Sequence, residues 1–296
     1  MIEVNSILLI YNPNALKGKI EEQLPYIKQR LSLRYSVVET MVTINATSAE
    51  ELSTKFANKY DVVVAVGGDG TVRQVINGIM KSGAKCLLGV LPCGSCNDVA
   101  HSLHIPNKIS KAVDCLLRLN TTNYDLLFDG EEYTAYSFAA GYLTESVYKT
   151  NWKAKRKFGR TAYVFTGIGH AFKLPALPIT LTYDNKRVHD KFLYVMLVNG
   201  ENTGGFCINK GERLDNGKVK LVAIKGKKGF LSLRAFIRLF MFGIKAVKNN
   251  KNVIVEDVST IEIENHSNAP VLVDGELTHF LKKKFTVVNG LTVIKK

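Results

Sequence analysis

Short apolar strands that alternate with helical patterns fill the first 120 or so residues of the chain. Four runs are rich in Val, Ile and Leu: residues 6–13, 35–42, 60–68 and 85–94. Helical spacing of apolar residues predicts helices over residues 17–31, 48–58, 72–81 and 109–119. This alternation is typical of a parallel sheet with helices on both faces, which also explains why the strands are almost wholly apolar. We therefore expect an N-terminal three-layer α/β domain.

The pattern changes after Asn123 to strands that alternate polar and apolar residues. Six such segments are residues 133–141, 178–200, 217–224, 253–265, 269–276 and 284–294. Asp184-Asn185, Asn216-Gly217 and Asn289-Gly290 are typical of hairpin turns, and two helical patterns, residues 159–173 and 230–248, interrupt the strands. We expect a C-terminal antiparallel β-sandwich, with domains at 1–124 and 125–285 and residues 286–296 returning to the first.

The composition is that of a folded protein large enough for two domains, with 296 residues, 46% apolar and 22% charged. Its most strongly apolar run, residues 239–244, is far shorter than the roughly 18 residues that indicate a membrane span. The N-terminus lacks the basic region of a signal peptide, and five cysteines, an odd number, do not form a disulfide framework. We therefore expect a cytoplasmic protein.

The net charge of +14 falls mainly on the second half of the chain. Residues 1–124 hold 13 basic and 10 acidic side chains, whereas residues 125–296 hold 27 and 16. Nucleic acid, an anionic membrane surface and a merely solvated basic face all fit such an excess. The sequence has no zinc-finger spacing, RNP signature, KH loop or helix-turn-helix pattern, so we do not expect nucleic acid as a partner.

Two glycine-containing loops follow the third and fourth predicted strands. The first, GGDGT at residues 67–71, lets the backbone approach a ligand closely and precedes a helix whose N–H groups can bind an anion. A carboxylate at Asp69 that faces a phosphate needs a bridging cation, usually Mg²⁺. A capped βα turn is the alternative. The sequence has neither a Walker A motif nor G-x-G-x-x-G.

The second loop, LPCGSCNDVA at residues 91–100, contains Cys93 and Cys96. A Cys-x-x-Cys pair can be a redox centre or half of a zinc site, but the sequence offers no second ligand pair. The frame Pro-x-Gly-Ser-x-Asn-Asp is more informative, because Gly94 admits a close ligand while Ser95 and Asn97 offer a hydroxyl and an amide. Whether the cysteines have a redox role stays open.

The two loops, some twenty residues apart, resemble those of the diacylglycerol kinase catalytic family, the soluble bacterial lipid kinases related to sphingosine kinases. The resemblance covers essentially the whole chain and includes Asn12-Pro13, Asp125, residues 153–168, residues 214–217 and the VDGE of residues 273–276. It implies a two-domain kinase with ATP and Mg²⁺ in a cleft between the domains. The residues that it implies for the nucleotide are Asn12, Gly67, Gly68, Asp69, Gly70, Thr71, Gly94, Ser95 and Asn97.

The same resemblance assigns roles to five acidic residues. It implies that Asp69 works with Mg²⁺ on the phosphates, that Glu276 is the general base on a lipid hydroxyl, and that Asp274 and Asp125 support it. Asp215 is implied as the ligand of a structural Mg²⁺, although the nearby Arg213 leaves the retention of this metal open. Phosphoryl transfer suits such residues, because it needs neutralised phosphates and an acid that orients the attacking hydroxyl. Taken alone, Asp274-Gly275-Glu276 indicates a hairpin turn.

Basic residues among aromatic ones suit a membrane interface. One such cluster comprises Trp152, Lys153, Lys155, Arg156, Lys157, Phe158 and Arg160. The helical pattern from residue 230 is apolar on much of its circumference and carries Arg234, Arg238, Lys245 and Lys248, so it can lie on a bilayer or pack on the sandwich with its basic side chains extended to solvent. The expected partners are a lipid substrate and an anionic membrane surface, and exposed strand edges allow a homodimer.

The predicted function is ATP-dependent and Mg²⁺-dependent phosphorylation of the hydroxyl of diacylglycerol or a similar lipid, at the inner face of the membrane. An NAD kinase is an alternative, because that family shares GGDGT. A second alternative is a protein of the same fold that binds nucleotide or lipid without catalysis.

Overall fold

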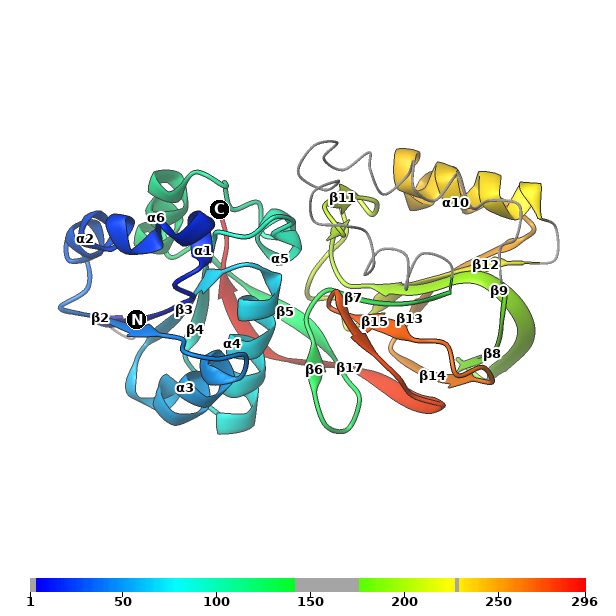
Figure 1. The fold of residues 1–296 in the computed structure, drawn as a ribbon, viewed down its shortest axis with the longest axis horizontal. Coiled ribbons are helices and arrows are strands. Elements are labelled where there is room, and N and C mark those ends of the chain that lie inside the picture. Colours follow the sequence, from blue (N-terminus) through cyan, green and yellow to red (C-terminus); the bar gives the residue numbers. More distant parts are fainter. Residues whose placement is uncertain (1–3, 142–175, 227–228) are drawn as a thin grey trace. The chain divides into compact units, whose positions relative to one another are not determined.

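A computed structural model describes residues 4–141, 176–226 and 229–296 (Figure 1). Contacts divide the chain into two compact units. Unit 1 comprises Met1–Leu126, Leu214–Asn216 and Val288–Lys296, and unit 2 comprises Leu127–Arg213 and Gly217–Val287. The basic cluster of residues 152–160 and the helix expected over residues 159–173 lie outside the described residues. Within the described ranges, no helix combines the length and the apolar character that a membrane crossing requires.

Unit 1 contains a parallel sheet in the order β17-β4-β3-β1-β2. Its strands are β1 (Ser6–Tyr11), β2 (Val37–Val42), β3 (Val62–Gly67), β4 (Leu87–Pro92) and the end of β17 (Lys282–Ile294). Its helical segments are α1 (Ala15–Gly18), α2 (Ile20–Leu31), α3 (Ser48–Phe56), η1 (Ala57–Lys59), α4 (Asp69–Ser82), α5 (Asp98–Ser102) and α6 (Ile109–Arg118). Every residue of β3 is buried, as expected for a central strand covered on both faces.

Two helices of unit 1 begin at other residues than the sequence predicts. The helix expected from Lys17 begins at Ile20, because Leu16, Lys17 and Gly18 all have positive φ values, which a right-handed helix excludes. In contrast, α4 begins at Asp69, three residues before the expected Val72, because the GGDGT loop itself forms the first helical turn. The third and fourth residues of this loop therefore lie at a helix N-terminus.

Unit 2 consists mainly of antiparallel strands, in the order β16-β15-β7-β9-β8-β14-β17, with β12 paired to β9 and β13 paired to β12. The strands from residue 121 onward are β5 (Thr121–Phe128), β6 (Tyr133–Thr134), β7 (Ser137–Gly141), β8 (Leu177–Tyr183), β9 (Lys186–Val198), β10 (Asn202–Thr203), β11 (Phe206–Cys207), β12 (Val219–Lys225), β13 (Val253–Val258), β14 (Thr260–Asn265), β15 (Val271–Val273), β16 (Glu276–Thr278) and β17. The predicted fold class, a parallel α/β domain followed by an antiparallel β domain, is confirmed.

Strand β9 lies between two apolar cores of unit 2. Val195 and Leu197 point into the core enclosed by the antiparallel strands, whereas Tyr194 and Met196 point into a second core beneath helix α10 (Phe230–Phe242). Burial of both faces explains why this strand is apolar at successive positions. The helix expected to reach Lys248 ends at Phe242, because Gly243 has φ 79° and ψ 179°, and only a short 3-10 turn, η3 (Ile244–Ala246), follows.

The predicted hairpin turns have different outcomes. Asp184 and Asn185 join β8 to β9 with φ values of 45° and 60°, as a tight two-residue turn requires. The prediction of a turn at Asn289-Gly290 is wrong, because both residues lie inside β17. The Asn289 amide donates a hydrogen bond to Asp125 Oδ1 at 3.0 Å instead of forming a turn.

Helix α4 packs so closely against α3 at Gly78 that a side chain does not fit. A Cβ atom there would lie 2.5 Å from the Glu50 carbonyl oxygen. We expect Gly78→Ala to lower the free energy of unfolding by about 1–3 kcal/mol, although alanine favours a helix over glycine by about 1 kcal/mol at open positions. Urea denaturation measures the change. Gln29→Ala, on the exposed side of α2, is the control, and equal stabilities for the two variants would contradict the packing.

Candidate functional site

Four loops of unit 1 meet at the edge where parallel strands end. They follow β1, β2, β3 and β4, and begin at Asn12, Thr43, Gly68 and Cys93. The connection that leaves β1 leads to β2, whereas the connection that leaves β3 leads in the opposite direction to β4, so the two connections diverge between β1 and β3. Ligands of open α/β sheets bind at this kind of switch point, outside the carboxyl ends of the strands.

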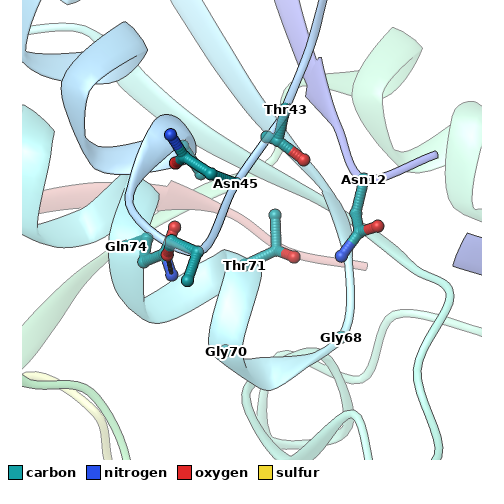
Figure 2. A pocket seen from close by; sticks show the side chains of 9 residues that line it. Asn12, Thr43, Asn45, Gly68, Gly70, Thr71 and Gln74 are labelled. Atoms are coloured by element: carbon teal, nitrogen blue, oxygen red, sulfur yellow. Dashed lines mark hydrogen bonds between the residues drawn. The ribbon is translucent and has the colours of Figure 1, made fainter. Parts of the chain in front are cut away.

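A pocket of about 280 Å³ opens at this edge (Figure 2). Its lining residues are Asn12, Thr43, Asn45, Ala46, Ala49, Gly68, Gly70, Thr71 and Gln74. None of these side chains is charged, and their polar groups are amides and hydroxyls. The pocket also lies at the N-terminus of α4, a helix of 14 residues, where unsatisfied N–H groups favour an anion. It therefore suits a ligand with a neutral polar part and a phosphate group.

The sequence prediction missed Thr43, Asn45 and Gln74, which line the pocket beside the expected Asn12 and Thr71. Thr43 and Asn45 follow β2, so the position after a predicted parallel strand could have indicated them. Gln74 stands four residues after Gly70 on α4, one helical turn further along the same face. Its amide donates a hydrogen bond to the Ala46 carbonyl, which links α4 to the β2 loop.

The two glycine loops touch each other through their backbones. A Cβ atom at Gly94 would lie 2.5 Å from Gly68 Cα, and one at Gly68 would lie 3.2 Å from Gly94 Cα. The Cys93 N–H also donates a hydrogen bond of 2.8 Å to the Gly67 carbonyl. Glycine is therefore required at these positions for the contact between the loops, in addition to any approach of a ligand.

Asn97 holds the second loop closed. Its φ of 54° is in the left-handed region, its Oδ1 accepts the Gly94 N–H at 2.8 Å, and its Nδ2 donates to the Gly94 carbonyl at 3.1 Å. The Nδ2 group also donates to Asn107 Oδ1 at 3.3 Å, and the predicted contact of Asn97 with a nucleotide stays a prediction. Ser95, which lies between Gly94 and Asn97 in the sequence, is exposed. In this structure Asn97 shapes the loop, and Ser95 is the side chain that the loop presents.

The carboxylate of Asp69 faces the N-terminus of α5. Its Oδ1 accepts the Val99 N–H at 3.4 Å, and the N–H groups of Asn97 and Asp98 also point to it. Burial raises the pKa of this carboxyl above its ordinary value, and the N–H groups oppose that rise. Asp69 therefore joins the two loops as well as offering a negative charge beside the pocket.

The residues around Asp69 fit a cation that arrives with phosphates. The described residues contain no group of three or more His, Cys, Asp or Glu side chains that could hold a metal alone. Mg²⁺ commonly binds through one or two carboxylates and takes its other ligands from water and substrate phosphates. Asp69 can supply one such carboxylate, but it also accepts backbone N–H groups at the start of α5, and its role as a Mg²⁺ ligand stays a prediction.

Asp125 and Asp215 both belong to unit 1. Asp125, on β5, is fully buried, and its N–H donates to the Leu214 carbonyl at 2.7 Å. This contact holds residues 214–216 against β5, and the hydrogen bond from Asn289 holds residues 288–296 against the same strand. Asp125 thus has a structural role, and both its predicted support of catalysis and the metal role of Asp215 stay predictions.

Asp274 and Glu276 belong to a hairpin of unit 2 and have opposite environments. Asp274 is 3% exposed, and its carboxylate accepts the N–H groups of Ala135, Tyr136 and Ser137 at 2.6, 2.9 and 3.0 Å. Asp274 and Gly275 have φ values of 48° and 80°, which form the two-residue turn between β15 and β16. Glu276, the residue after the turn, is exposed. The turn therefore anchors one carboxylate and presents the other. The predicted grouping of these residues with Asp69 in one cleft stays a prediction.

Cys93 of the second loop is poorly suited to disulfide exchange. All five cysteines of the chain are free thiols. Burial raises the pKa of the Cys93 thiol to about 12, so the thiolate that disulfide exchange requires is scarce at neutral pH.

The contact between the loops gives a prediction for stability. We expect Gly94→Ala to lower the free energy of unfolding by about 1–3 kcal/mol, because its Cβ would push the Gly68 backbone away. Ser95→Ala, in the same loop but exposed, should change it by less than about 0.5 kcal/mol. Thermal or urea denaturation compares the two, and a fully stable Gly94→Ala variant would mean that the loops do not need this contact.

Comparisons with known proteins agree with the geometry of unit 1. Residues 6–128 match the diacylglycerol kinase catalytic domain. A diacylglycerol kinase of Staphylococcus haemolyticus is 30% identical over 272 residues, which cover 90% of this chain and 81% of that protein. A diacylglycerol kinase of Staphylococcus carnosus is 28% identical over 270 residues, covering 90% of this chain and 87% of its own.

Solved structures share the fold over the full chain. A diacylglycerol kinase structure from Bacillus anthracis has a TM-score of 0.81 at 21% identity, and covers 100% of this chain and 98% of its own. A further structure from that organism has a TM-score of 0.86 at 24% identity, covering 100% and 97%. The family resemblance of the sequence motifs is confirmed by a relative that is 30% identical over nine-tenths of the chain. The protein belongs to the diacylglycerol kinase catalytic family.

Proposed function

We propose that this protein is a lipid kinase that transfers the γ-phosphoryl group of ATP to the hydroxyl of diacylglycerol or a similar lipid. The observation that carries the proposal is the pocket at the carboxyl edge of the unit 1 sheet, with the Asp69 carboxylate beside it, in a chain of the diacylglycerol kinase family. An NAD kinase shares GGDGT, but the relatives that match most of this chain are diacylglycerol kinases.

In this proposal, ATP binds at the pocket of unit 1. The amides of Asn12 and Gln74 and the hydroxyls of Thr43 and Thr71 supply donors and acceptors for the uncharged part of the nucleotide. The N-terminus of α4 and the exposed Ser95 loop suit the phosphates. Asp69 would hold Mg²⁺, which neutralises phosphate charge during transfer.

We assign the general base to Glu276. Glu276 is exposed, so its carboxylate is accessible to an attacking hydroxyl, whereas the Asp274 carboxylate is buried and accepts three backbone N–H groups. Asp274 instead fixes the turn that presents Glu276. Its assignment as a supporting residue is thus a positioning role.

The partners follow from the substrate. A diacylglycerol-like lipid resides in a bilayer, so the enzyme must work at a membrane surface, and the basic second half of the chain suits an anionic one. We propose peripheral association with the inner face of the cytoplasmic membrane.

One assay tests the function directly. Purified protein is mixed with labelled ATP, Mg²⁺ and micelles that contain diacylglycerol, a sphingoid base or a polyprenol, or with free NAD. We expect label in diacylglycerol and none without Mg²⁺. Label in NAD would support the NAD kinase, and ATP binding without label in any acceptor would support a non-catalytic binding protein.

Asp69 is expected to be essential for transfer. Asp69→Asn removes the charge of the side chain and weakens its bonds to the N–H groups of α5, so we expect a fall in kcat/KM of about 10²-fold or more, and circular dichroism checks that the variant is folded. Asp114→Asn, which breaks a surface ion pair with Arg30, is the charge control and should retain activity. The labelled-ATP assay measures both, and an active Asp69→Asn enzyme would refute the assigned role.

Substitutions of Glu276 and Asp274 should have different effects, the first on activity and the second on stability. We expect Glu276→Gln to lower kcat by about 10²-fold with little change in unfolding, because the residue is exposed. Asp274→Asn should lower the free energy of unfolding by about 2–4 kcal/mol, since an amide cannot accept all three N–H groups. Glu131→Gln, an exposed carboxylate of the same unit, is the control for activity. The reverse pattern, with Glu276→Gln active and Asp274→Asn stable, would contradict both roles.

A further inference from the structure

Helix α10 exposes large apolar side chains on its outer face. Phe230 is 77% exposed, Leu231 47%, Met241 56% and Phe242 70%. Among the described residues of unit 2, Leu281 is the one other large apolar side chain with comparable exposure. At 100° per residue, these four side chains fall within about a third of the helix circumference. They form one apolar face, together with the exposed Arg234 and Arg238.

The opposite face of α10 is fixed to the sheet, so the outer face is not needed for the core. Ala235, Phe236 and Leu239 are buried on the cluster that lines β9 and β12. Tyr194 packs edge-on against Phe236 at 5.1 Å between ring centroids. Phe240 packs edge-on against Phe206 at 5.5 Å and in a tilted arrangement against Phe236 at 4.8 Å. Figure 1 shows α10 lying along β12 and β9 of unit 2. The helix therefore presents its outer face on a rigid support.

The segment of chain that carries this face is basic, although Lys220 pairs with Glu212 and Asp257, and Lys225 pairs with Asp190. Residues 216–255 contain ten Lys and Arg side chains and no Asp or Glu. On the helix itself, Arg234 and Arg238 lie between the exposed apolar side chains, and Lys245, Lys248 and Lys251 follow it at exposed positions. A protein partner for an apolar face does not require such a uniform charge, whereas an anionic lipid surface matches it, because apolar rings enter the headgroup boundary and basic side chains bind the phosphates.

We propose that the outer face of α10, defined by Phe230, Leu231, Arg234, Arg238, Met241 and Phe242, docks on an anionic lipid bilayer. The inference deepens the proposed function, on which it rests for the presence of the substrate in a membrane. Docking itself needs neither ATP nor catalysis. Phe230 and Phe242 are expected to insert between headgroups at the two ends of the helix, while Arg234 and Arg238 contact lipid phosphates between them.

Sedimentation with vesicles tests the docking. The full-length protein should bind phosphatidylglycerol vesicles and bind pure phosphatidylcholine vesicles at least about tenfold more weakly. Phe230→Ser with Phe242→Ser should weaken binding to phosphatidylglycerol about tenfold or more, since two apolar anchors are lost. Arg234→Gln with Arg238→Gln should cause a similar loss at low salt, which shrinks in high salt where the charges are screened.

Matched variants keep the test specific. Leu33→Ser with Leu281→Ser removes similarly exposed apolar side chains, and Arg34→Gln with Lys108→Gln removes two exposed charges of unit 1. Both double variants should bind as the unchanged protein does. Circular dichroism checks that every variant is folded. Wild-type binding by the α10 variants would overturn the proposal. So would a change of oligomeric state in those variants, measured by analytical ultracentrifugation, because the face would then contact a second copy.

Different results would refute the docking and the kinase activity. Asp69→Asn, once shown to be folded, should bind vesicles as the unchanged protein does, because Asp69 belongs to unit 1 and α10 to unit 2. Vesicle binding without phosphorylation of any lipid would leave the docking face in place and remove the proposed function. Phosphorylation of micellar diacylglycerol, together with unchanged vesicle binding by the α10 variants, would support the kinase function and refute the docking face.

Discussion

The contact between Gly68 and Gly94 is the constraint on which the candidate nucleotide site depends. It holds the loops after β3 and β4 within van der Waals distance, so that the Asp69 carboxylate reaches the N–H groups at the start of α5. Asn97 completes this arrangement by closing its own loop around Gly94. A side chain at Gly94 would push the loops apart and move the carboxylate away from its partners, whereas one at Gly68 would need a smaller shift. The glycines of both motifs thus serve the protein's own packing before they serve a ligand.

Unit 2 shows how a buried carboxylate can position an exposed one. Three N–H groups at the start of β7 bind Asp274, which fixes a turn with two positive φ values and leaves Glu276 at the first position of β16. The buried charge is costly unless these donors satisfy it, so the geometry of the turn is strongly determined. Two acidic residues that look equivalent in the sequence VDGE therefore have different roles. The turn predicted from the residues and the catalytic site implied by the family are both compatible with this hairpin.

Much of the fold could be predicted from hydrophobic periodicity, because buried parallel strands and amphipathic helices leave strong patterns. The limits lie in features set by contacts between distant residues. Asn289-Gly290 has the composition of a turn, but pairing of β17 and the bond to Asp125 keep it extended. Thr43, Asn45 and Gln74 carry no motif, and become site residues only because sheet order places the β2 loop beside α4. The internal bonds of Asn97 are likewise invisible in a motif that names the residue without its partners.

The shared strand β17 has a consequence for how the chain is made. Its residues up to Val287 belong to unit 2, and those from Val288 pair in parallel with β4 of unit 1 through Thr292 and Val293. The ribosome therefore synthesises this strand of the first sheet only after all of unit 2, some two hundred residues later than β4. Until then the β4 edge lacks its neighbour and is open to wrong pairing. The site at the carboxyl ends of these strands is thus expected to mature late in translation, when the two units have both emerged.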